Sequence, residues 1–244
     1  EPLEASRAIV YKEAQFYIIS MAVLLLVFSL GVIYYPVGGP NGPALGEMNR
    51  LLASLPIMLY GLYIFIQYQD TADHKSTEDI SDVRPVYSWF LLTVSLLIIL
   101  VGVELLVRSA IEFGDLLGTP SFLWGMTIVA AGTSVPDAIM SVRTAVEQNP
   151  ETSLANVLGS NVFDLLVCIP AGVMIAGSTV VNFTVVAPMM GFLILGTVFL
   201  FTFMRTELVL TDGEAWLLLL LYGLFVVWLV AEYFYWLNLL PGVP

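Results

Sequence analysis

Two aspartates lie inside long apolar stretches of the sequence that otherwise carry almost no charge. Asp137 follows Thr133 by four residues and precedes Ser141 by four, so in a helix all three side chains share one face. Asp164 lies inside a second apolar stretch, where it ends a similar polar motif. A carboxylate inside a bilayer costs several kcal/mol unless it faces water, a partner or an ion, so both aspartates are candidates for a functional site. Hydroxyl and carboxylate oxygens on one helix face are suited to binding a cation.

The second stretch repeats the arrangement of the first. Asn156, Ser160 and Asp164 follow one another at intervals of four residues, and the small Gly159 beside them allows two helices to approach closely. Neither aspartate has a lysine or arginine at helical spacing within the membrane part of its own stretch. Two such faces turned toward each other would form a cavity lined by oxygen atoms, which selects hard cations such as Ca²⁺ or Na⁺. The alternative is that these hydroxyls and amides only hold neighbouring helices together.

A proline interrupts the first of these motifs, Gly132-Thr133-Ser134-Val135-Pro136-Asp137. Pro136 has no N–H group, and its ring clashes with the carbonyl four residues back, which belongs to Gly132. In a bilayer that freed carbonyl needs another donor or a cation. We therefore expect a broken helix that offers carbonyl, hydroxyl and carboxylate oxygens together.

The other ionisable groups and the single cysteine favour structural roles. Glu104 lies four residues before Arg108, which is the spacing of an ion pair on one helix. Glu232 lies close enough to the end of its apolar stretch to reach the lipid headgroups. The remaining acidic residues, Glu13 among them, are expected in solvated regions, and Cys168 is expected to be a small buried hydrophobic side chain.

The composition indicates that the two polar motifs lie on membrane helices. The chain has 244 residues, of which 59% are hydrophobic and only 11% are charged. A water-soluble domain of this size needs far more charged residues on its surface, so a soluble enzyme is excluded. The 8 basic against 20 acidic residues leave no basic surface for binding nucleic acid. The partner that the composition predicts is the lipid bilayer.

The chain is expected to be an all-α polytopic membrane protein with about seven transmembrane helices. A helix needs roughly 20 predominantly apolar residues to cross a bilayer. The stretches of suitable length are Phe16–Tyr35, Leu51–Gln67, Val86–Arg108, Ser121–Ala145, Leu154–Ala176, Val181–Met204 and Ala215–Leu237. Turns are expected at residues 36–46, at Gly177–Ser178 and at Thr211–Gly213.

The distribution of basic residues predicts the orientation of these helices. Only Arg50 and Arg108 lie at helix ends on one side of the membrane. The other side carries Arg7, Lys12, Lys75, Arg84, Arg143 and Arg205. By the positive-inside rule this second side is cytoplasmic, so residues 70–85 are expected in the cytoplasm and the C-terminus outside. The short loops favour a prokaryotic plasma membrane.

The two polar motifs together resemble the second α-repeat of the cation/Ca²⁺ exchanger superfamily. The residues that carry the resemblance are Gly132-Thr133-Ser134-Val135-Pro136-Asp137 with Ser141, and Asn156 with Gly159-Ser160-Asn161-Val162-Phe163-Asp164. They are most similar to the sodium/calcium exchanger branch, including its potassium-dependent members. The resemblance implies the C-terminal part of a ten-helix inverted-repeat exchanger fold, with ions bound at the midplane where the repeats meet.

This fold would divide the chain into three parts. Residues 1–69 would form two transmembrane helices that end the first repeat, residues 70–85 a cytoplasmic linker, and residues 86–244 the second five-helix repeat. Residues 1–67 contain neither the Gly-Thr-Ser and Gly-Ser-Asn segments nor the acidic ligand of a first repeat. The missing first-repeat half is therefore an expected partner, either in the same longer chain, which we favour, or in another chain.

The resemblance also implies a role for each motif residue. The implied metal ligands are Ala130 through its backbone carbonyl, Thr133, Ser134, Asp137, Ser160 and Asp164. Asp137 resembles the principal Ca²⁺ carboxylate of the second repeat, whereas Thr133 and Ser134 match hydroxyl ligands for Na⁺. Helix breaking and packing are assigned to Gly132, Pro136, Asn156, Gly159 and Asn161.

The implied function is that of a secondary active antiporter that exchanges Na⁺ for Ca²⁺ by alternating access, not that of an enzyme. No resident cofactor is expected, because Ca²⁺ and Na⁺ are the transported ions. K⁺ is a further candidate, since an acidic residue at Asp164 resembles the potassium-dependent members. A H⁺-driven exchanger is the alternative within the superfamily.

Two alternatives come from other classes of protein. An intramembrane aspartyl protease also places two aspartates on neighbouring helices, but it needs Tyr-Asp and Gly-x-Gly-Asp segments. Here Phe163 precedes Asp164, and Phe113 precedes the Gly114-Asp115 pair. A non-transporting membrane scaffold would use the same polar residues only for helix packing, and it predicts no stabilisation by ions.

Overall fold

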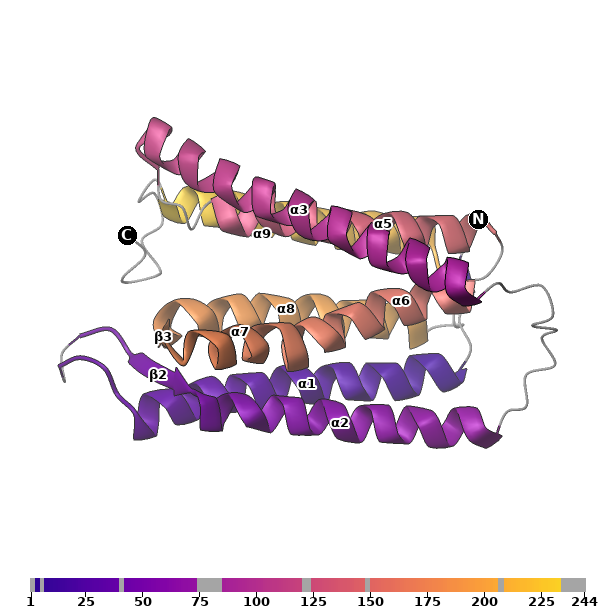
Figure 1. Ribbon diagram of the computed structural model, residues 1–244, viewed down its shortest axis with the longest axis horizontal. Coiled ribbons are helices and arrows are strands. Elements are labelled where there is room, and N and C mark those ends of the chain that lie inside the picture. The colour runs from indigo at the N-terminus through magenta and orange to yellow at the C-terminus, as the bar shows by residue number, and fades with distance from the viewer. Residues whose placement is uncertain are drawn as a thin grey trace. The chain divides into compact units, whose positions relative to one another are not determined.

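Helices make up most of the part of the chain that the structure describes. The computed structural model describes residues 3–4, 7–39, 42–73, 85–119, 124–147, 150–205 and 209–233 (Figure 1). The α-helices are α1 (Arg7–Tyr34), α2 (Arg50–Asp73), α3 (Pro85–Leu117), α5 (Ala130–Val146), α6 (Pro150–Phe163), α7 (Ile169–Ala176), α8 (Phe183–Arg205) and α9 (Asp212–Tyr233). The π-helices are η1 (Gly125–Val129) and η2 (Asp164–Cys168). The strands are β1 (Leu3–Glu4), β2 (Leu45–Asn49), β3 (Ser178–Asn182) and β4 (Val209–Leu210).

Seven helical segments among the described residues are long and apolar enough to cross a membrane, which confirms the predicted number of spans. Their boundaries differ from the predicted ones. Helix α1 begins at Arg7 rather than at Phe16, and α3 extends to Leu117 rather than ending at Arg108. Charged residues mark the edge of an apolar stretch, but a helix can continue beyond that edge into water or headgroups.

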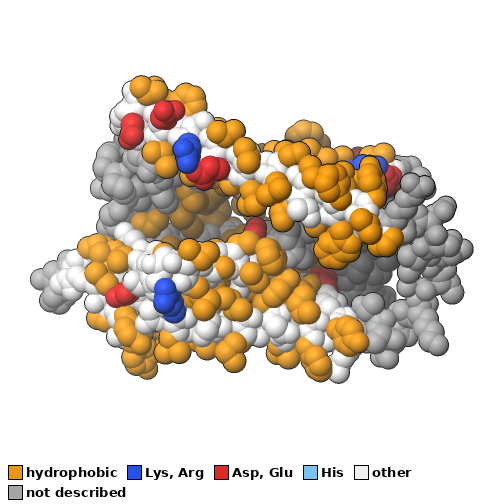
Figure 2. All heavy atoms as spheres, viewed as in Figure 1, with side chains coloured by type: hydrophobic (Ala, Val, Ile, Leu, Met, Phe, Trp, Pro, Cys, Tyr) orange, Lys and Arg blue, Asp and Glu red, His pale blue; other side chains and the backbone are white. Residues whose placement is uncertain are grey.

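The side chains exposed on these helices are mainly apolar. In α3 only Ala110 and Gly114 are buried within the described structure. The ion pair predicted on this helix is confirmed, with Arg108 Nε 2.7 Å from Glu104 Oε1. Figure 2 shows hydrophobic side chains over much of the visible face, with scattered acidic and basic ones. Because apolar surface of this extent is characteristic of contact with lipid, the chain is an integral membrane protein.

Contacts among residues divide the chain into two compact units. The first comprises residues 1–66 and 137–244, and the second comprises residues 67–136. The second unit contains α3, η1 and the start of α5, and α3 contacts η1 within it. The boundary lies inside α5, directly before Asp137. Most of the predicted linker at residues 70–85 lies outside the described residues, and α2 continues through its first four residues to Asp73, so the division of the chain there stays a prediction.

Helix α1 is at the centre of the first unit. It contacts α6, α8 and η2, and its side chains Met21, Leu24 and Val27 are almost completely buried. Leu158 and Val162 of α6 are fully buried in the same cluster. Apolar residues at intervals of three and four form a continuous stripe along a helix, so α1 and α6 can pack along such stripes. The helix that carries the second polar motif is therefore held against α1.

Two short β-ribbons connect segments that are far apart in the sequence. Strand β2 pairs antiparallel with β3, and β1 pairs antiparallel with β4. Directly after β2, Arg50 donates from Nε to the Met174 carbonyl oxygen at 3.1 Å. Turns were expected at residues 36–46 and at Gly177–Ser178, and the strands that begin there were missed. Strands this short, paired with distant segments, leave no periodic pattern in the sequence.

The start of α9 corrects the turn expected at Thr211–Gly213. Asp212 and Gly213 are the first residues of the helix. The Thr211 N–H donates to Glu214 Oε2 at 2.9 Å, and the Glu214 N–H donates in return to Thr211 Oγ1 at 3.4 Å. These contacts form a capping box, in which a threonine and a glutamate three residues later satisfy the free N–H groups of a helix start.

Three side chains lie in surroundings that differ from those expected. Glu13 is only 7% exposed in α1, and the Tyr63 hydroxyl donates to its Oε2 at 2.9 Å. Glu13 was expected in a solvated region because the apolar pattern placed the start of α1 after it. Cys168 is exposed rather than buried, and Glu232 is 4% exposed rather than at the headgroups. Both positions depend on which helix faces pack together, which the sequence pattern does not specify.

Gly46→Ala is expected to destabilise the fold. Gly46 in β2 lies so close to α1 that a Cβ atom there would overlap with the backbone of Gly31 and Val32. Since backbone atoms cannot move aside as the end of a side chain can, we expect a loss of about 1–3 kcal/mol in the free energy of unfolding. Thermal unfolding of the detergent-solubilised protein, followed by tryptophan fluorescence, measures this loss.

Gly61→Ala is the matched control for that substitution. No described atom lies within 4 Å of a Cβ atom built at Gly61, which lies in α2. Alanine is a better helix former than glycine, so this variant should unfold at the wild-type temperature or slightly above it. An unchanged unfolding temperature for Gly46→Ala would contradict the close approach of β2 to α1.

Candidate cation-binding site

Two side chains of α6 connect this helix to α5 within the first unit. The Asn156 amide nitrogen donates to the Asp137 carbonyl oxygen at 3.2 Å and to Ser141 Oγ at 2.9 Å. The Ser153 hydroxyl donates to the Ser141 carbonyl oxygen at 2.8 Å. Ser153 was not among the predicted site residues, although its spacing of three residues from Asn156 places the two on one helix face. The Asn156 bond holds the backbone of Asp137 beside the helix that leads to Asp164, whereas the Ser153 bond joins the two helices farther along α5.

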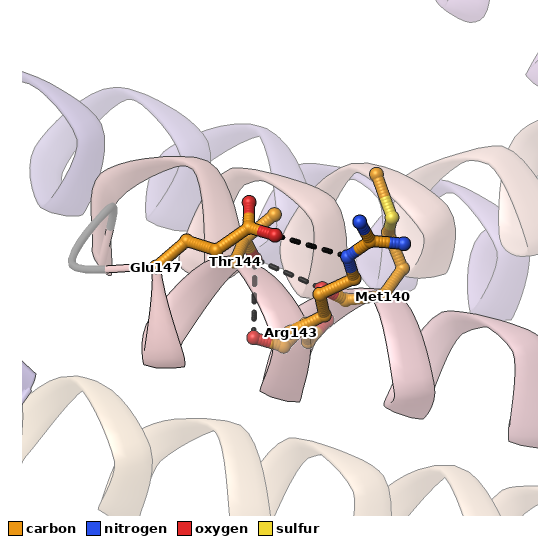
Figure 3. Close-up of polar contacts among 5 residues, drawn as sticks. Met140, Arg143, Thr144 and Glu147 are labelled. Atoms are coloured by element: carbon orange, nitrogen blue, oxygen red, sulfur yellow. Dashed lines mark hydrogen bonds and ion pairs between the residues drawn. The ribbon is translucent and has the colours of Figure 1, made fainter.

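The carboxylates of Asp137 and Asp164 are not neutralised by a basic side chain in the part of the chain that the structure describes. Arg143, on the same helix as Asp137, has its Nε 3.0 Å from Glu147 Oε1 instead (Figure 3). The Thr144 hydroxyl between them donates to two carbonyl oxygens of the preceding turn. The Asp137 side chain is half-buried and the Asp164 side chain is exposed within the described structure.

The two carboxylates are close enough to interact electrostatically. Asp137 exerts a Coulomb repulsion on Asp164, and the Cys168 thiol lies beside the Asp164 carboxylate. Like charges at close range destabilise each other, and a cation bound between or beside them removes that repulsion. The first unit therefore contains two neighbouring carboxylates whose mutual repulsion a bound cation would reduce.

Both polar motifs adjoin π-helical turns. Helix η1 ends directly before Ala130, and η2 begins at Asp164. A π-turn widens the helix by one residue per turn and is frequently found at functional sites. Residues four apart lie on the same side of a helix, and Asp164 and Cys168 are both exposed within the described structure. Neither π-helix was predicted, because a π-turn has no periodic pattern of its own in the sequence.

Two of the motif hydroxyls, those of Thr133 and Ser160, donate hydrogen bonds to backbone carbonyl oxygens of their own helices. In the second unit, Thr133 Oγ1 donates to the carbonyl oxygens of Val129 and Ala130 at 3.0 and 3.1 Å. In the first unit, Ser160 Oγ donates to the Val157 carbonyl oxygen at 3.1 Å. A hydroxyl has one proton and two lone pairs, so each of these oxygens can still coordinate a cation.

The expected metal ligands are divided between the two units. Those of the second unit are Ala130, Thr133 and Ser134, which precede Asp137 along α5. Those of the first unit are Asp137, Ser160 and Asp164. The first unit thus contains both carboxylates and one hydroxyl on α5, α6 and η2, with Asn156 joining the helices.

Helix α5 is continuous where a break was expected. It remains helical throughout with Pro136 inside it, so the predicted break at Gly132 and Pro136 is wrong. A proline removes one backbone hydrogen bond, and membrane helices tolerate this when neighbouring groups compensate. A Cβ atom at Gly132 would overlap with the Leu106 side chain of α3, so this glycine permits close packing in the second unit. No described atom lies within 4 Å of a Cβ atom built at Gly159.

An apolar cavity in the first unit does not include the carboxylates. Its volume is about 550 Å³, and α1, α6, α8 and α9 line it. One of its few polar lining groups is Asn161, whose amide donates to a carbonyl oxygen of its own helix at 2.8 Å. Neither Asp137 nor Asp164 lines this cavity, so it is not the candidate cation site.

Comparison with known proteins identifies the family. Residues 87–231, more than half of the chain, match the family described as sodium/calcium exchanger protein. The chain therefore belongs to this family, and the resemblance drawn from the two motifs is confirmed. No solved structure matches the chain significantly.

Three relatives illustrate the match. The chain is 37% identical over 76 residues to the sodium/calcium exchanger MaX1 of Methanosarcina acetivorans, covering 31% of this chain and 22% of the relative. It is 46% identical over 56 residues to the probable sodium/potassium/calcium exchanger CG1090 of Drosophila melanogaster, covering 23% and 9%. It is 27% identical over 182 residues to the uncharacterized membrane protein MJ0091 of Methanocaldococcus jannaschii, covering 74% and 57%. The chain thus spans between 9% and 57% of the length of these relatives.

Asp164→Asn is expected to leave the cation-free protein stably folded. The substitution removes a negative charge that is repelled by Asp137, so the unfolding temperature without Na⁺ or Ca²⁺ should be unchanged or raised by a few degrees. Thermal unfolding in choline buffer with a chelator measures this effect. Glu147→Gln, which breaks the exposed ion pair with Arg143, is the control and should change little. A large loss of stability in Asp164→Asn alone would show instead that this carboxylate supports the fold.

Proposed function

We propose that the complete protein is a secondary active antiporter that exchanges Na⁺ for Ca²⁺ across a membrane by alternating access. The observation that carries the proposal is the pair Asp137 and Asp164, which lie in membrane-spanning segments, belong to the same compact unit and form no ion pair among the described residues. A negatively charged site with oxygen ligands suits Ca²⁺ or Na⁺. Membership in the sodium/calcium exchanger family supports the same assignment.

The charge of the site supplies a physical reason for exchange. Without a cation, the two carboxylates would carry negative charge through the membrane interior, which is costly. One Ca²⁺ or several Na⁺ ions neutralise that charge, so the loaded site changes its exposure from one side of the membrane to the other more readily than the empty one. An inward Na⁺ gradient would then drive Ca²⁺ outward.

We assign the cation ligands to the residues of the two polar motifs. Asp137 is the principal Ca²⁺ carboxylate, and Asp164 is the acidic group on the adjoining helix. The further oxygen ligands are the hydroxyls of Thr133, Ser134 and Ser160 and the carbonyl of Ala130. The donation of the Thr133 and Ser160 protons to the backbone supports this assignment, because it leaves their oxygens available. The first-repeat half, in the same longer chain or in another chain, supplies the remaining ligands.

Potassium coupling is a second candidate that one observation favours. Relatives that are 45% and 46% identical over short regions are named sodium/potassium/calcium exchangers, and the acidic Asp164 resembles the residue of potassium-dependent members, although some prokaryotic exchangers also have an aspartate there. A H⁺ gradient is the alternative driving force. The intramembrane-protease and scaffold alternatives gain no support from the family match.

The proposed orientation follows from the basic residues. Residues 70–85 are assigned to the cytoplasm and the C-terminus to the outside of a prokaryotic plasma membrane. In this orientation a cell would use the exchanger to remove Ca²⁺ from its cytoplasm.

Asp137→Asn is expected to abolish Ca²⁺ transport, because it removes the charge that pairs with the ion. Radioactive Ca²⁺ uptake is measured in proteoliposomes that contain the complete transporter, are loaded with Na⁺ and are diluted into Na⁺-free buffer. Wild-type protein should take up Ca²⁺ only when the Na⁺ gradient is present. Parallel dilutions with K⁺, and with a H⁺ gradient in place of Na⁺, identify the coupled ion.

Glu147→Gln is the matched control, because it removes one carboxylate from the residue directly after the same helix. It should transport at the wild-type rate. Normal Na⁺-driven uptake by the Asp137→Asn variant would contradict the assignment of Asp137. Absence of uptake by the wild type under every gradient would contradict the exchanger function itself.

A further inference from the structure

We infer that Asn156 is a positioning residue that fixes Asp137 relative to Asp164 and thereby sets the affinity of the site for Ca²⁺. The inference rests on the proposed function. Asn156 lies on α6 eight residues before Asp164, and its amide bonds the backbone of the residue that carries the other carboxylate. Asn156 is thus hydrogen-bonded to the backbone of Asp137 and lies on the helix that leads to Asp164.

The orientation of the Asn156 amide follows from its partners. A backbone carbonyl oxygen can only accept a hydrogen bond, so the group that faces the Asp137 carbonyl must be the amide nitrogen. The same nitrogen has a second proton, which it donates to Ser141 Oγ at 2.9 Å. Both N–H groups of the Asn156 amide therefore donate to α5, one of them to the backbone of Asp137.

A second bond between the helices lies farther from the carboxylates. The Ser153 hydroxyl donates to the Ser141 carbonyl oxygen at 2.8 Å. Ser153 lies three residues before Asn156 on α6, and Ser141 lies four residues after Asp137 on α5. Ser141 and Ser153 are both buried, with 8% and 6% exposure. This second bond connects the same two helices without contacting Asp137, so the contributions of helix packing and of ligand placement can be separated by mutation.

Ligand placement matters because cation ligands tolerate little displacement. Ca²⁺ is bound by oxygens at roughly 2.3–2.6 Å, and substitutions of groups that orient metal ligands typically reduce metal affinity about 10- to 100-fold. Release of the Asp137 carbonyl from Asn156 would let this turn of α5 move away from α6. The Ca²⁺ concentration for half-saturation should then rise, whereas loss of the Ser153 bond should lower only the stability of the fold.

The test compares three variants of the complete transporter in the same proteoliposomes. Asn156→Ala removes both bonds to α5. Asn156→Asp keeps the shape of the side chain but cannot donate to the Asp137 carbonyl, and its added negative charge would by itself strengthen cation binding. Ser153→Ala is the matched control for the loss of an interhelical hydrogen bond. The measured quantities are the Ca²⁺ concentration for half-maximal Na⁺-driven uptake and the unfolding temperature without cations.

We expect both Asn156 variants to raise the half-saturating Ca²⁺ concentration at least about tenfold, and Ser153→Ala to lower the unfolding temperature without shifting that concentration. If Asn156→Ala does not fold, the Asn156→Asp variant decides. A half-saturating concentration for Asn156→Asp equal to or below that of the wild type would overturn the inference. An equal shift in Ser153→Ala would also overturn it, because any loosening of the helix pair would then suffice. Wild-type protein that transports no Ca²⁺ would instead refute the proposed function.

Discussion

A charged carboxylate inside a membrane is costly unless an opposite charge, water or an ion neutralises it, and the candidate cation site depends on this constraint. Arg108 and Arg143 are paired with Glu104 and Glu147 on their own helices, so neither of these basic side chains is used to neutralise Asp137 or Asp164. The nearby hydroxyls direct their protons to backbone carbonyls and keep oxygen lone pairs available. We propose that a cation is the partner of these carboxylates, and the match to the sodium/calcium exchanger family supports this proposal.

The described fold explains how the first unit can hold such a site in place. Helix α1 packs against α6 and α8, and the β2–β3 ribbon ties the segments before α2 and α8 together. Gly46 lets this ribbon approach α1 closely. Asn156 and Ser153 then connect α6 to the part of α5 that begins with Asp137. Each step adds a rigid contact, so the position of the acidic side chains follows from ordinary helix packing and a small number of hydrogen bonds.

The sequence predicted those features that depend on local pattern. The seven spans and the Glu104–Arg108 pair were predicted because apolar length and a four-residue spacing are visible in the chain itself. The strand pairing, the π-turns and the burial of Glu13 were not, because they depend on contacts between distant segments or on irregular backbone geometry. The expected break at Pro136 was wrong because a single lost hydrogen bond does not end a membrane helix. The motif spacing nevertheless placed both aspartates correctly in helical segments, and both residues belong to the first unit.

Equilibrium binding of radioactive Ca²⁺ to the purified complete transporter tests the central claim most directly, namely that Asp137 and Asp164 share one cation site. Wild-type protein is compared with Asp137→Asn, Asp164→Asn and the double variant, each titrated with Na⁺ as a competitor. The account predicts specific Ca²⁺ binding that Na⁺ displaces, that either single substitution strongly weakens, and that the double substitution reduces no further than the more severe single one. Undiminished, Na⁺-sensitive Ca²⁺ binding by the double variant would contradict it.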